Sequence, residues 1–163
     1  TEPGLQTVWY FYQVGGSTMT GSKVWPNRMP KVGQKALRSR LITPHDIELF
    51  SEISGDNNPL HRDEEAARKS GFSGIVAQGG ITSAILNALV AEDMPGSGTV
   101  FMNVNWNFKA PVHPGETITG HAEITKVRGD KPICELLTWV TIDDGTVVLD
   151  GSAVCYTMPL EPR

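Results

Sequence analysis

The sequence predicts an α+β domain in which an antiparallel sheet is wrapped around one buried helix. Residues 81–91, ITSAILNALVA, are apolar on nearly every side, which is typical of a helix enclosed by protein. From residue 99 onward, alternating segments separated by turn residues predict a series of antiparallel strands. One earlier strand and an irregular helical segment complete a pattern typical of a single α+β domain.

Capping and turn residues define the elements that precede the buried helix. Residues 34–41 alternate in polarity and predict the first strand. Thr43 as N-cap and Pro44 at the first helical position begin a helix that Gly55 ends. A second, short helix is expected over residues 63–70.

The chain after the buried helix predicts strands and tight turns. The expected strands span residues 99–109, 117–127, 133–142 and 147–157. If Asp144 and Gly145 form a two-residue turn, Cys134 and Cys155 become cross-strand neighbours in this last hairpin. We expect both thiols to stay reduced, because a cytoplasmic protein is the simplest interpretation of the composition.

The composition excludes several classes of protein. The chain has 163 residues, enough for one domain, with 39% hydrophobic and 20% charged residues. A net charge of −4 argues against a nucleic-acid binder, and no apolar run reaches the roughly 18 residues of a membrane span. Two cysteines and four dispersed histidines give no metal-ligand spacing, so no metal site is expected.

Residues 1–30 differ in composition from residues 31–163, which we take as the domain. An aromatic run, residues 8–14, precedes a Gly/Ser/Thr stretch typical of a linker. Because the chain begins without methionine, Met19 or Met29 is a candidate for the natural start, and the extension is interpreted as a tag or dispensable segment. The alternative is an added strand or a flap that binds a partner.

The stretch SGDNNPLHRD is the strongest candidate for chemistry. Asp56 and His61 offer a proton acceptor and a proton donor on one stiff loop, close enough to face the same small target. The alternative is a solvated polar turn, in which Gly55 ends the helix and Pro59 prevents it from resuming. Spacing alone does not decide between the two.

Three segments resemble the MaoC-like (R)-specific enoyl-CoA hydratases: SGDNNPLHRDEEAA, GIVAQGGITSAIL and MPGSGTVFMNVNWNFKAPVHPGETI. The similarity covers about residues 31–158, and Asp56, Asn58, Pro59 and His61 fill every position of the motif D-x-N-P-x-H. The resemblance implies a hot-dog fold and a homodimer joined through sheet edges. It also implies hydration of a trans-2-enoyl-CoA to an (R)-3-hydroxyacyl-CoA without metal or redox cofactor.

The resemblance also implies roles for the loop and for the start of the buried helix. Asp56 and His61 are expected to activate water and to move the proton, while Asn58 and Pro59 hold the loop. The backbone N–H of Gly79 is expected to stabilise the thioester oxygen at the helix N-terminus.

The residues around Gly79 are expected to line the substrate site. Gly80 lets the thioester approach the backbone closely. Gln78 stands where many relatives have histidine, so it can donate a hydrogen bond but cannot titrate. Ser83 or Thr82 is expected in the pocket, although such hydroxyls often bond only to the preceding helical turn.

Other polar residues receive no catalytic role. His45 is expected at the surface, and His113 and His121 are expected to be structural. No cation is assigned to the CoA phosphates. Two other functions stay open: a hot-dog acyl-CoA thioesterase, and a non-catalytic acyl-CoA-binding domain.

Overall fold

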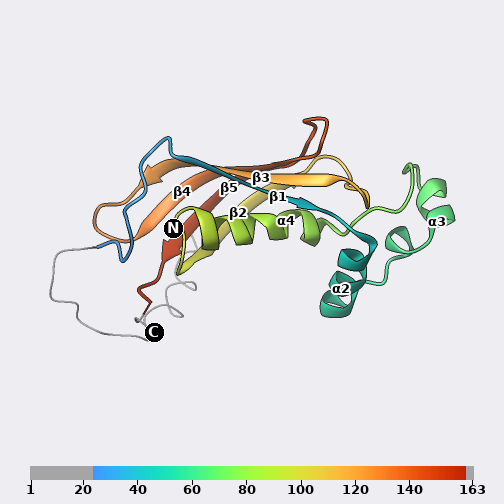
Figure 1. Cartoon of the computed structure of the whole chain (residues 1–163), viewed down its shortest axis with the longest axis horizontal. Helices are drawn as coiled ribbons and strands as arrows, with labels where there is room; N and C mark the ends of the chain where they lie inside the picture. Colours follow the sequence, from blue (N-terminus) through green and yellow to red (C-terminus); the bar gives the residue numbers. More distant parts are fainter. Residues whose placement is uncertain (1–23, 161–163) are drawn as a thin grey trace, which may run out of the picture.

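The computed structural model describes residues 24–160, which form one sheet with helices on one side of it (Figure 1). The strands are β1 (Lys35–Leu41), β2 (Thr99–Phe108), β3 (Thr117–Val127), β4 (Ile133–Thr141) and β5 (Val147–Thr157). The helices are α2 (Pro44–Ser54), α3 (Glu64–Lys69) and α4 (Gly79–Ala88), with short turns η1 (Pro59–His61) and η2 (Leu89–Asp93). The expected elements are all present, with ends shifted by at most three residues.

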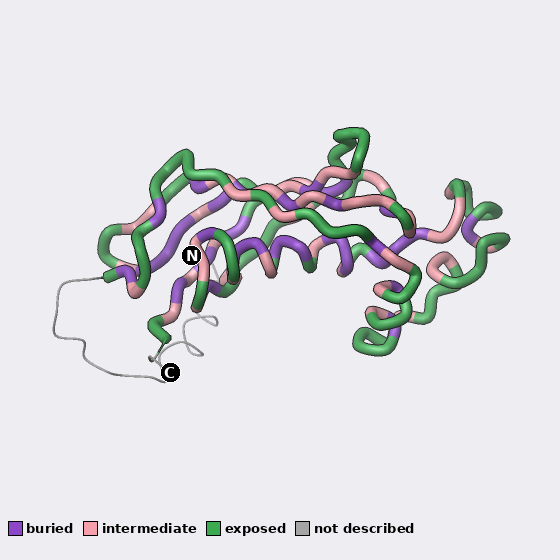
Figure 2. Tube along the Cα trace, in the orientation of Figure 1, coloured by how far each residue is buried: buried purple, intermediate pink, exposed green. Residues whose placement is uncertain are grey.

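The five strands are antiparallel and lie in the order β1-β3-β4-β5-β2. The sheet curves over α4, whose inward face is buried, while α2 and α3 lie beyond one end of the sheet (Figures 1 and 2). Leu86 and Leu89 of this helical segment are fully buried, together with Ile118 and Val140 of the sheet. This is the hot-dog arrangement, an antiparallel sheet around a central helix, that the sequence predicts.

Local capping places α2 as expected. The hydroxyl of Thr43 accepts from the N–H of Asp46, and the Asp46 carboxylate accepts from the N–H of Thr43, which completes a capping box. Gly55 ends the helix with φ of 75°, a left-handed conformation that favours glycine. These contacts fix where the chain leaves α2, and therefore where the next loop begins.

The central helix starts two residues before the expected position. Gln78 is its N-cap, and α4 begins at Gly79. After Ala88 the chain continues through the π-helical turn η2 to Asp93 instead of ending at residue 91. The start at Gly79 agrees with the expectation that this glycine lies at a helix N-terminus.

The turn between β4 and β5 differs from the expected two-residue turn. The N–H of Ile142 donates to the carbonyl of Thr146 at 3.1 Å, so three residues form the loop. A register shift between Val140 and Thr141 offsets the additional loop residue. Because the two irregularities cancel, the register farther along the hairpin is the expected one.

The two cysteines are cross-strand neighbours, as predicted. Cys134 and Cys155 are register partners, and both are buried, free thiols. Burial raises the pKa of Cys134 to about 12 and also raises the pKa of Cys155. Both side chains act as small apolar groups of the core.

The described end of the N-terminal segment packs onto the domain. Trp25 is 4% exposed, and its indole N–H donates to the carbonyl of Arg128 at 2.9 Å. The chain therefore already packs onto the domain before residue 31, where the sequence placed the start of the domain. The aromatic run and the linker-like stretch lie outside the described residues.

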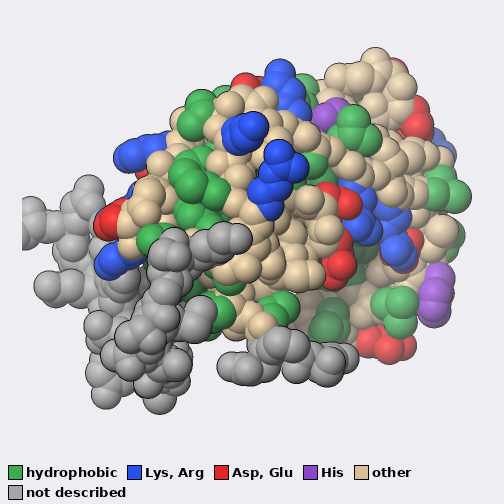
Figure 3. Space-filling view, turned by 60° about the vertical axis from the view of Figure 1, so that its left-hand side comes forward, with side chains coloured by type: hydrophobic (Ala, Val, Ile, Leu, Met, Phe, Trp, Pro, Cys, Tyr) green, Lys and Arg blue, Asp and Glu red, His purple; other side chains and the backbone are tan. Residues whose placement is uncertain are grey.

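Charges on the surface are mixed in sign. Among the described residues, ion pairs such as Lys35 with Glu123 and Arg128 with Asp130 join charges of opposite sign. Figure 3 shows Lys and Arg side chains interspersed with Asp and Glu on one face of the molecule. Such a face carries no continuous basic stripe. Within residues 24–160, no helix is long and apolar enough to cross a membrane.

Candidate active site

Asp56 and His61 lie together on the loop that follows α2. The Nε2 atom of His61 is 3.4 Å from the Oδ2 atom of Asp56. The His61 side chain is 11% exposed and the Asp56 side chain is 40% exposed. The carboxylate therefore faces solvent while the imidazole is held in the protein, and the structure brings together the two groups that the sequence singled out.

Asn58 and Pro59 stiffen this loop, as expected. The N–H of Asn58 donates to Oδ1 of Asp56 at 3.1 Å, and Oδ1 of Asn58 accepts from the N–H of Leu60 at 3.2 Å. Pro59 then begins the turn η1, which ends at His61. Because Oδ1 of Asp56 is used within the loop, Oδ2 is the oxygen directed toward His61.

The other nitrogen of His61 fixes the orientation of the ring. Its Nδ1 atom lies 2.6 Å from the carbonyl oxygen of Val76, an acceptor, so Nδ1 carries a proton. In the neutral ring, Nε2 then has the lone pair that faces Asp56. Val76 is three residues before Gly79, so this contact also ties the loop to the start of α4.

His113 holds the same segment through the neighbouring carbonyl group. Its Nδ1 atom donates to the carbonyl of Ile75 at 2.8 Å, and its Nε2 atom is 3.2 Å from the hydroxyl of Ser73. The N–H of Ala77 donates to the carbonyl of Val112 at 2.7 Å. Two neighbouring carbonyls, those of Ile75 and Val76, are thus each bound by a histidine. The sequence predicts a structural role for His113, but not this contact.

Glu64 anchors the beginning of that segment. Its carboxylate accepts from Arg68 at 2.7 Å and from the N–H of Ile75 at 3.3 Å. These hydrogen bonds lower the pKa of Glu64. The extended segment between α3 and α4 is therefore held by side chains at both its N–H and carbonyl groups.

The N-terminus of α4 offers free backbone donors. Gly79 is exposed, and it and Gly80 are the first two residues of the helix, so their N–H groups have no acceptor within it. A Cβ atom on Gly79 would lie 3.0 Å from Cε1 of Phe108. One on Gly80 would lie 2.1 Å from Cζ of Phe50, so any larger residue there would have to displace this ring. The helix start is thus bracketed by two phenylalanine rings.

Gln78 has a different environment from the one expected. Its side chain is 2% exposed, and its Nε2 atom donates to the carbonyl of Ile47 at 3.2 Å and to the hydroxyl of Ser51 at 2.9 Å. Its Oε1 atom has no hydrogen-bond partner among residues 24–160. Both N–H groups of the amide bind α2, so the side chain joins α2 to α4, and a role of Gln78 in binding substrate stays a prediction.

The hydroxyl of Ser83 bonds within its own helix, which is the alternative to a place in the substrate pocket. Its hydroxyl donates to the carbonyl of Gly80 at 3.1 Å, within the preceding turn of the helix. Thr82 is 4% exposed and belongs to the core. The role of Ser83 in binding substrate therefore stays a prediction.

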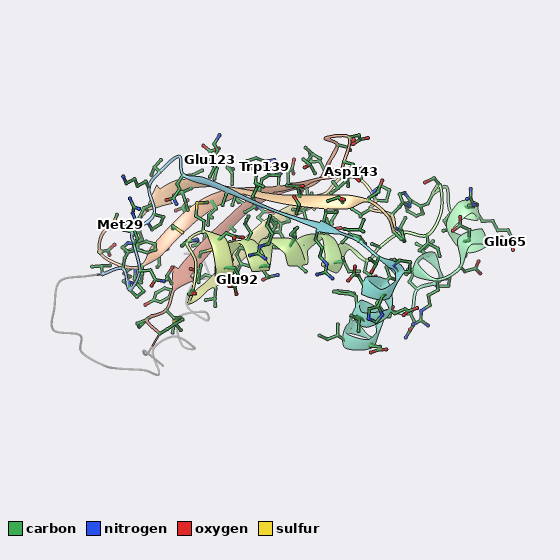
Figure 4. All side chains as sticks on the ribbon, in the orientation of Figure 1. Met29, Glu65, Glu92, Glu123, Trp139 and Asp143 are labelled. Atoms are coloured by element: carbon green, nitrogen blue, oxygen red, sulfur yellow. The ribbon has the colours of Figure 1, made fainter. Side chains whose placement is uncertain are left out.

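The remaining histidines lie elsewhere. His45 is exposed on α2, 3.4 Å from Glu48. His121 stacks on Trp139 with ring centroids 4.9 Å apart, and Figure 4 places Trp139 on the face of the sheet opposite α4. The part of the chain that the structure describes contains no cluster of three or more His, Cys, Asp or Glu suited to a metal ion.

Comparison with known proteins identifies the family. The model of the MaoC like domain matches residues 27–142, more than half of the chain. This chain belongs to the MaoC-like domain family. The match includes the loop with Asp56 and His61, the whole of α4, and four of the five strands.

Individual relatives agree with this assignment. The chain is 32% identical over 124 residues to an (R)-specific enoyl-CoA hydratase of Aeromonas caviae, covering 76% of this chain and 92% of the relative. It is 32% identical over 110 residues to a mitochondrial 3-hydroxyacyl-[acyl-carrier-protein] dehydratase of Arabidopsis thaliana, covering 68% and 65%. A solved structure of an (R)-hydratase from A. caviae superposes with a TM-score of 0.76 at 30% identity, covering 81% and 100%.

Proposed function

We propose that this MaoC-like protein is a hydratase that adds water reversibly to a trans-2-enoyl-CoA, giving an (R)-3-hydroxyacyl-CoA. The observation that carries the proposal is the pair formed by Asp56 and His61, 3.4 Å apart, on a loop tied through Val76 to the start of α4. The relatives named as hydratases and dehydratases support the same type of reaction.

The pair is suited to hold and activate one water molecule. In the neutral state of the ring, Nε2 of His61 and Oδ2 of Asp56 are both acceptors, and at 3.4 Å they are too far apart for a good direct hydrogen bond. A water molecule can donate one O–H to each atom. Removal of one proton by the pair leaves an oxygen nucleophile that attacks the β-carbon of the enoyl group.

The remaining steps complete the proton balance. Attack on the β-carbon moves the electron pair of the double bond through the α-carbon to the thioester oxygen. The free N–H of Gly79 stabilises the negative oxygen, aided by the helix dipole. The pair then returns the proton to the α-carbon, so water is added without loss of any group. In dehydration the same pair removes the proton from the α-carbon and gives it to the leaving oxygen.

A single pair on one side of the substrate gives one product configuration. Because both proton transfer and water attack come from the same loop, the addition is syn, and we expect the (R)-3-hydroxyacyl product. The experiment is incubation with crotonyl-CoA followed by chiral analysis of the 3-hydroxybutyryl group. An (S) or racemic product would contradict the proposed geometry.

The proposal also specifies coenzyme A as the group that carries the acyl chain. An acyl-carrier-protein thioester is the second candidate, since one relative bears that name. An acidic carrier protein is recognised by a basic surface, whereas this chain has a net charge of −4. We therefore expect a higher kcat/KM for crotonyl-CoA than for the crotonyl carrier protein, measured side by side.

We also propose that the protein is a cytoplasmic homodimer joined through β2. This edge strand has no neighbour on its outer side in the described sheet, and Val104 and Phe108 on it are 42% and 58% exposed. An unpaired apolar edge favours pairing with a second copy. Light scattering tests this: we expect the mass of a dimer, and Val104→Lys should shift it toward the monomer.

A further inference from the structure

A second group of reactive side chains lies on the segment that follows α3. The hydroxyl oxygen of Ser73 is 3.2 Å from Nε2 of His113, although the two residues are 40 positions apart in the sequence. Nδ1 of His113 lies 2.8 Å from the carbonyl oxygen of Ile75. A serine, a histidine and an acceptor that orients the histidine are the parts of an activated nucleophile.

The carbonyl of Ile75 fixes which nitrogen of His113 carries the proton. A carbonyl only accepts, so Nδ1 is the donor, and in the neutral ring Nε2 has the lone pair. The hydroxyl of Ser73 must then donate to Nε2. The hydroxyl proton is thus directed at a base whose orientation is fixed, as general-base activation of a serine requires.

Glu64 supplies a negative charge beside this pair. Its carboxylate accepts from the N–H of Ile75, while His113 binds the carbonyl of the same residue. A Cβ atom on Gly74 would lie 3.0 Å from Oε1 of Glu64, so the carboxylate lies directly against this backbone. Hydrogen bonds from Arg68 and Ile75 lower the pKa of Glu64, and the charge of a protonated His113 lowers it further. The same attraction stabilises the imidazolium that forms when a serine proton is taken up.

The Ser73–His113 pair is accessible and has backbone donors next to it. Ser73 is exposed, and Figure 1 shows α3 at one end of the molecule. Neither the N–H of Ser73 nor that of Gly74 donates a hydrogen bond to another of residues 24–160. The N–H of the residue after a nucleophilic serine is a common oxyanion donor, and here that donor is Gly74.

This pair is separate from the site of the proposed hydration. Val76 contacts the loop that carries His61: its N–H donates to the carbonyl of Leu60, and its carbonyl accepts from His61. His113 binds the preceding residue, Ile75. No step of the proposed hydration uses the hydroxyl of Ser73, so that hydroxyl has no role in the reaction at His61.

We propose that Ser73 and His113 form a second reactive site, which hydrolyses small, uncharged carboxylic esters. Oγ of Ser73 attacks the ester carbonyl while Nε2 of His113 takes the hydroxyl proton. The C–O bond to the alcohol then breaks, and His113 gives the proton to the leaving oxygen. Water attacks the acyl-serine in the same way, which releases the acid and restores the hydroxyl. The sum is ester plus water giving acid plus alcohol.

The charges of α3 favour an uncharged substrate. Arg68 lies 2.7 Å from the carboxylate of Glu64, and Lys69 lies 2.6 Å from that of Glu65. Because both cations already bind carboxylates, they are not free to hold an anionic group such as a phosphate. The probe is therefore 4-nitrophenyl acetate, a small and uncharged ester.

The experiment measures turnover of 4-nitrophenyl acetate by the wild type and three variants. We expect Ser73→Ala and His113→Asn each to lower kcat/KM by at least about tenfold, because one lacks the nucleophile and the other the base. Ser70→Ala is the matched control and should not change it. Ser70 is also exposed, at the end of α3, and no histidine among residues 24–160 contacts its hydroxyl. Circular dichroism and thermal unfolding check that each variant is folded.

The charge of Glu64 is tested by Glu64→Gln, which keeps an acceptor for the N–H of Ile75. We expect ester hydrolysis to fall by roughly two- to fivefold at low salt, the range for an exposed pair of charges. The difference from the wild type should shrink at high salt, because salt screens exposed charges. A loss that salt does not change would contradict the electrostatic role of Glu64.

A second measurement needs no variant to be compared. An alkyl phosphonofluoridate reacts with an activated serine, whose oxygen displaces fluoride from phosphorus. We expect mass spectrometry of the wild type to find one adduct, on Ser73. Labelling elsewhere, no labelling, or equal ester turnover by the wild type and Ser73→Ala would show a hydrogen bond that only anchors the segment, and would overturn the proposal. Neither result depends on whether crotonyl-CoA is hydrated.

Discussion

The Oδ2 atom of Asp56 lies 3.4 Å from Nε2 of His61, while Nδ1 of the same ring binds the carbonyl of Val76 at 2.6 Å. The imidazole is thus held between the Asp56 carboxylate and a fixed backbone acceptor. This arrangement leaves one nitrogen and one oxygen free to act on the same water molecule.

Removing either member of the pair should abolish most of the activity. We expect Asp56→Asn and His61→Ala each to lower kcat by about 10²–10⁴-fold, the usual range for a lost general acid–base group. Hydration of crotonyl-CoA measures the effect, with circular dichroism as the control for folding. Near-normal turnover by either folded variant would remove the pair from the mechanism.

The start of α4 should tolerate no bulk at Gly79. Valine there would meet Phe108 and crowd the thioester oxygen, and the loss of one oxyanion donor costs about 2.7–4 kcal/mol in the transition state. We therefore expect Gly79→Val to lower kcat by roughly 10²–10³-fold.

Gln78→Ala is the comparison for that variant. Because the Gln78 amide binds Ile47 and Ser51, its removal should lower the melting temperature more than kcat. The order of the two kcat values is the test. A folded Gly79→Val enzyme that keeps its activity, beside a Gln78→Ala enzyme that loses it, would assign the oxyanion to the side chain.

His113 should act as a positioning residue. His113→Phe keeps an aromatic ring but removes the donor to Ile75, so the neighbouring Val76 carbonyl loses its fixed direction toward His61. We expect kcat to fall by up to about 10²-fold with little change in KM. His113→Asn places an amide N–H where Nδ1 was, and should recover most of kcat. Equal losses in both variants would show that only the ring packing matters.

The cysteines should be unreactive in the folded protein. The raised pKa of Cys134, about 12, means that its thiol is protonated at pH 8, and thiolate is the reactive form. We expect no labelling by an aromatic disulfide reagent in buffer and labelling of both cysteines in guanidinium chloride. Rapid stoichiometric labelling of the native protein would contradict the buried register pairing of Cys134 with Cys155.

Local signals in the sequence predicted helix α2 and the loop that follows it, which together position Asp56 and His61. Thr43, Pro44 and Gly55 define α2 through contacts within the helix and its caps, so no long-range information was needed. The loop from Asp56 to His61 is likewise fixed by bonds between residues two or three apart. The turn at residues 143–145 could not be predicted in this way. One added loop residue and one bulge offset each other, so the alternation of the two strands does not reveal either irregularity.

Long-range contacts could not be predicted from the sequence. His113 meets Ile75 across 38 positions, and Gln78 meets Ile47 across 31, so their partners depend on how α2, α4 and the loops are arranged in space.

Hydration itself is tested most directly by following two signals in one reaction with crotonyl-CoA. Loss of the enoyl absorbance reports addition of water across the double bond, and a thiol reagent reports release of free CoA. We expect the absorbance to fall to the hydration equilibrium without thiol release, and the fall to disappear in Asp56→Asn. Thiol release without hydration would instead assign a thioesterase, and the absence of both signals would favour a non-catalytic acyl-CoA-binding domain.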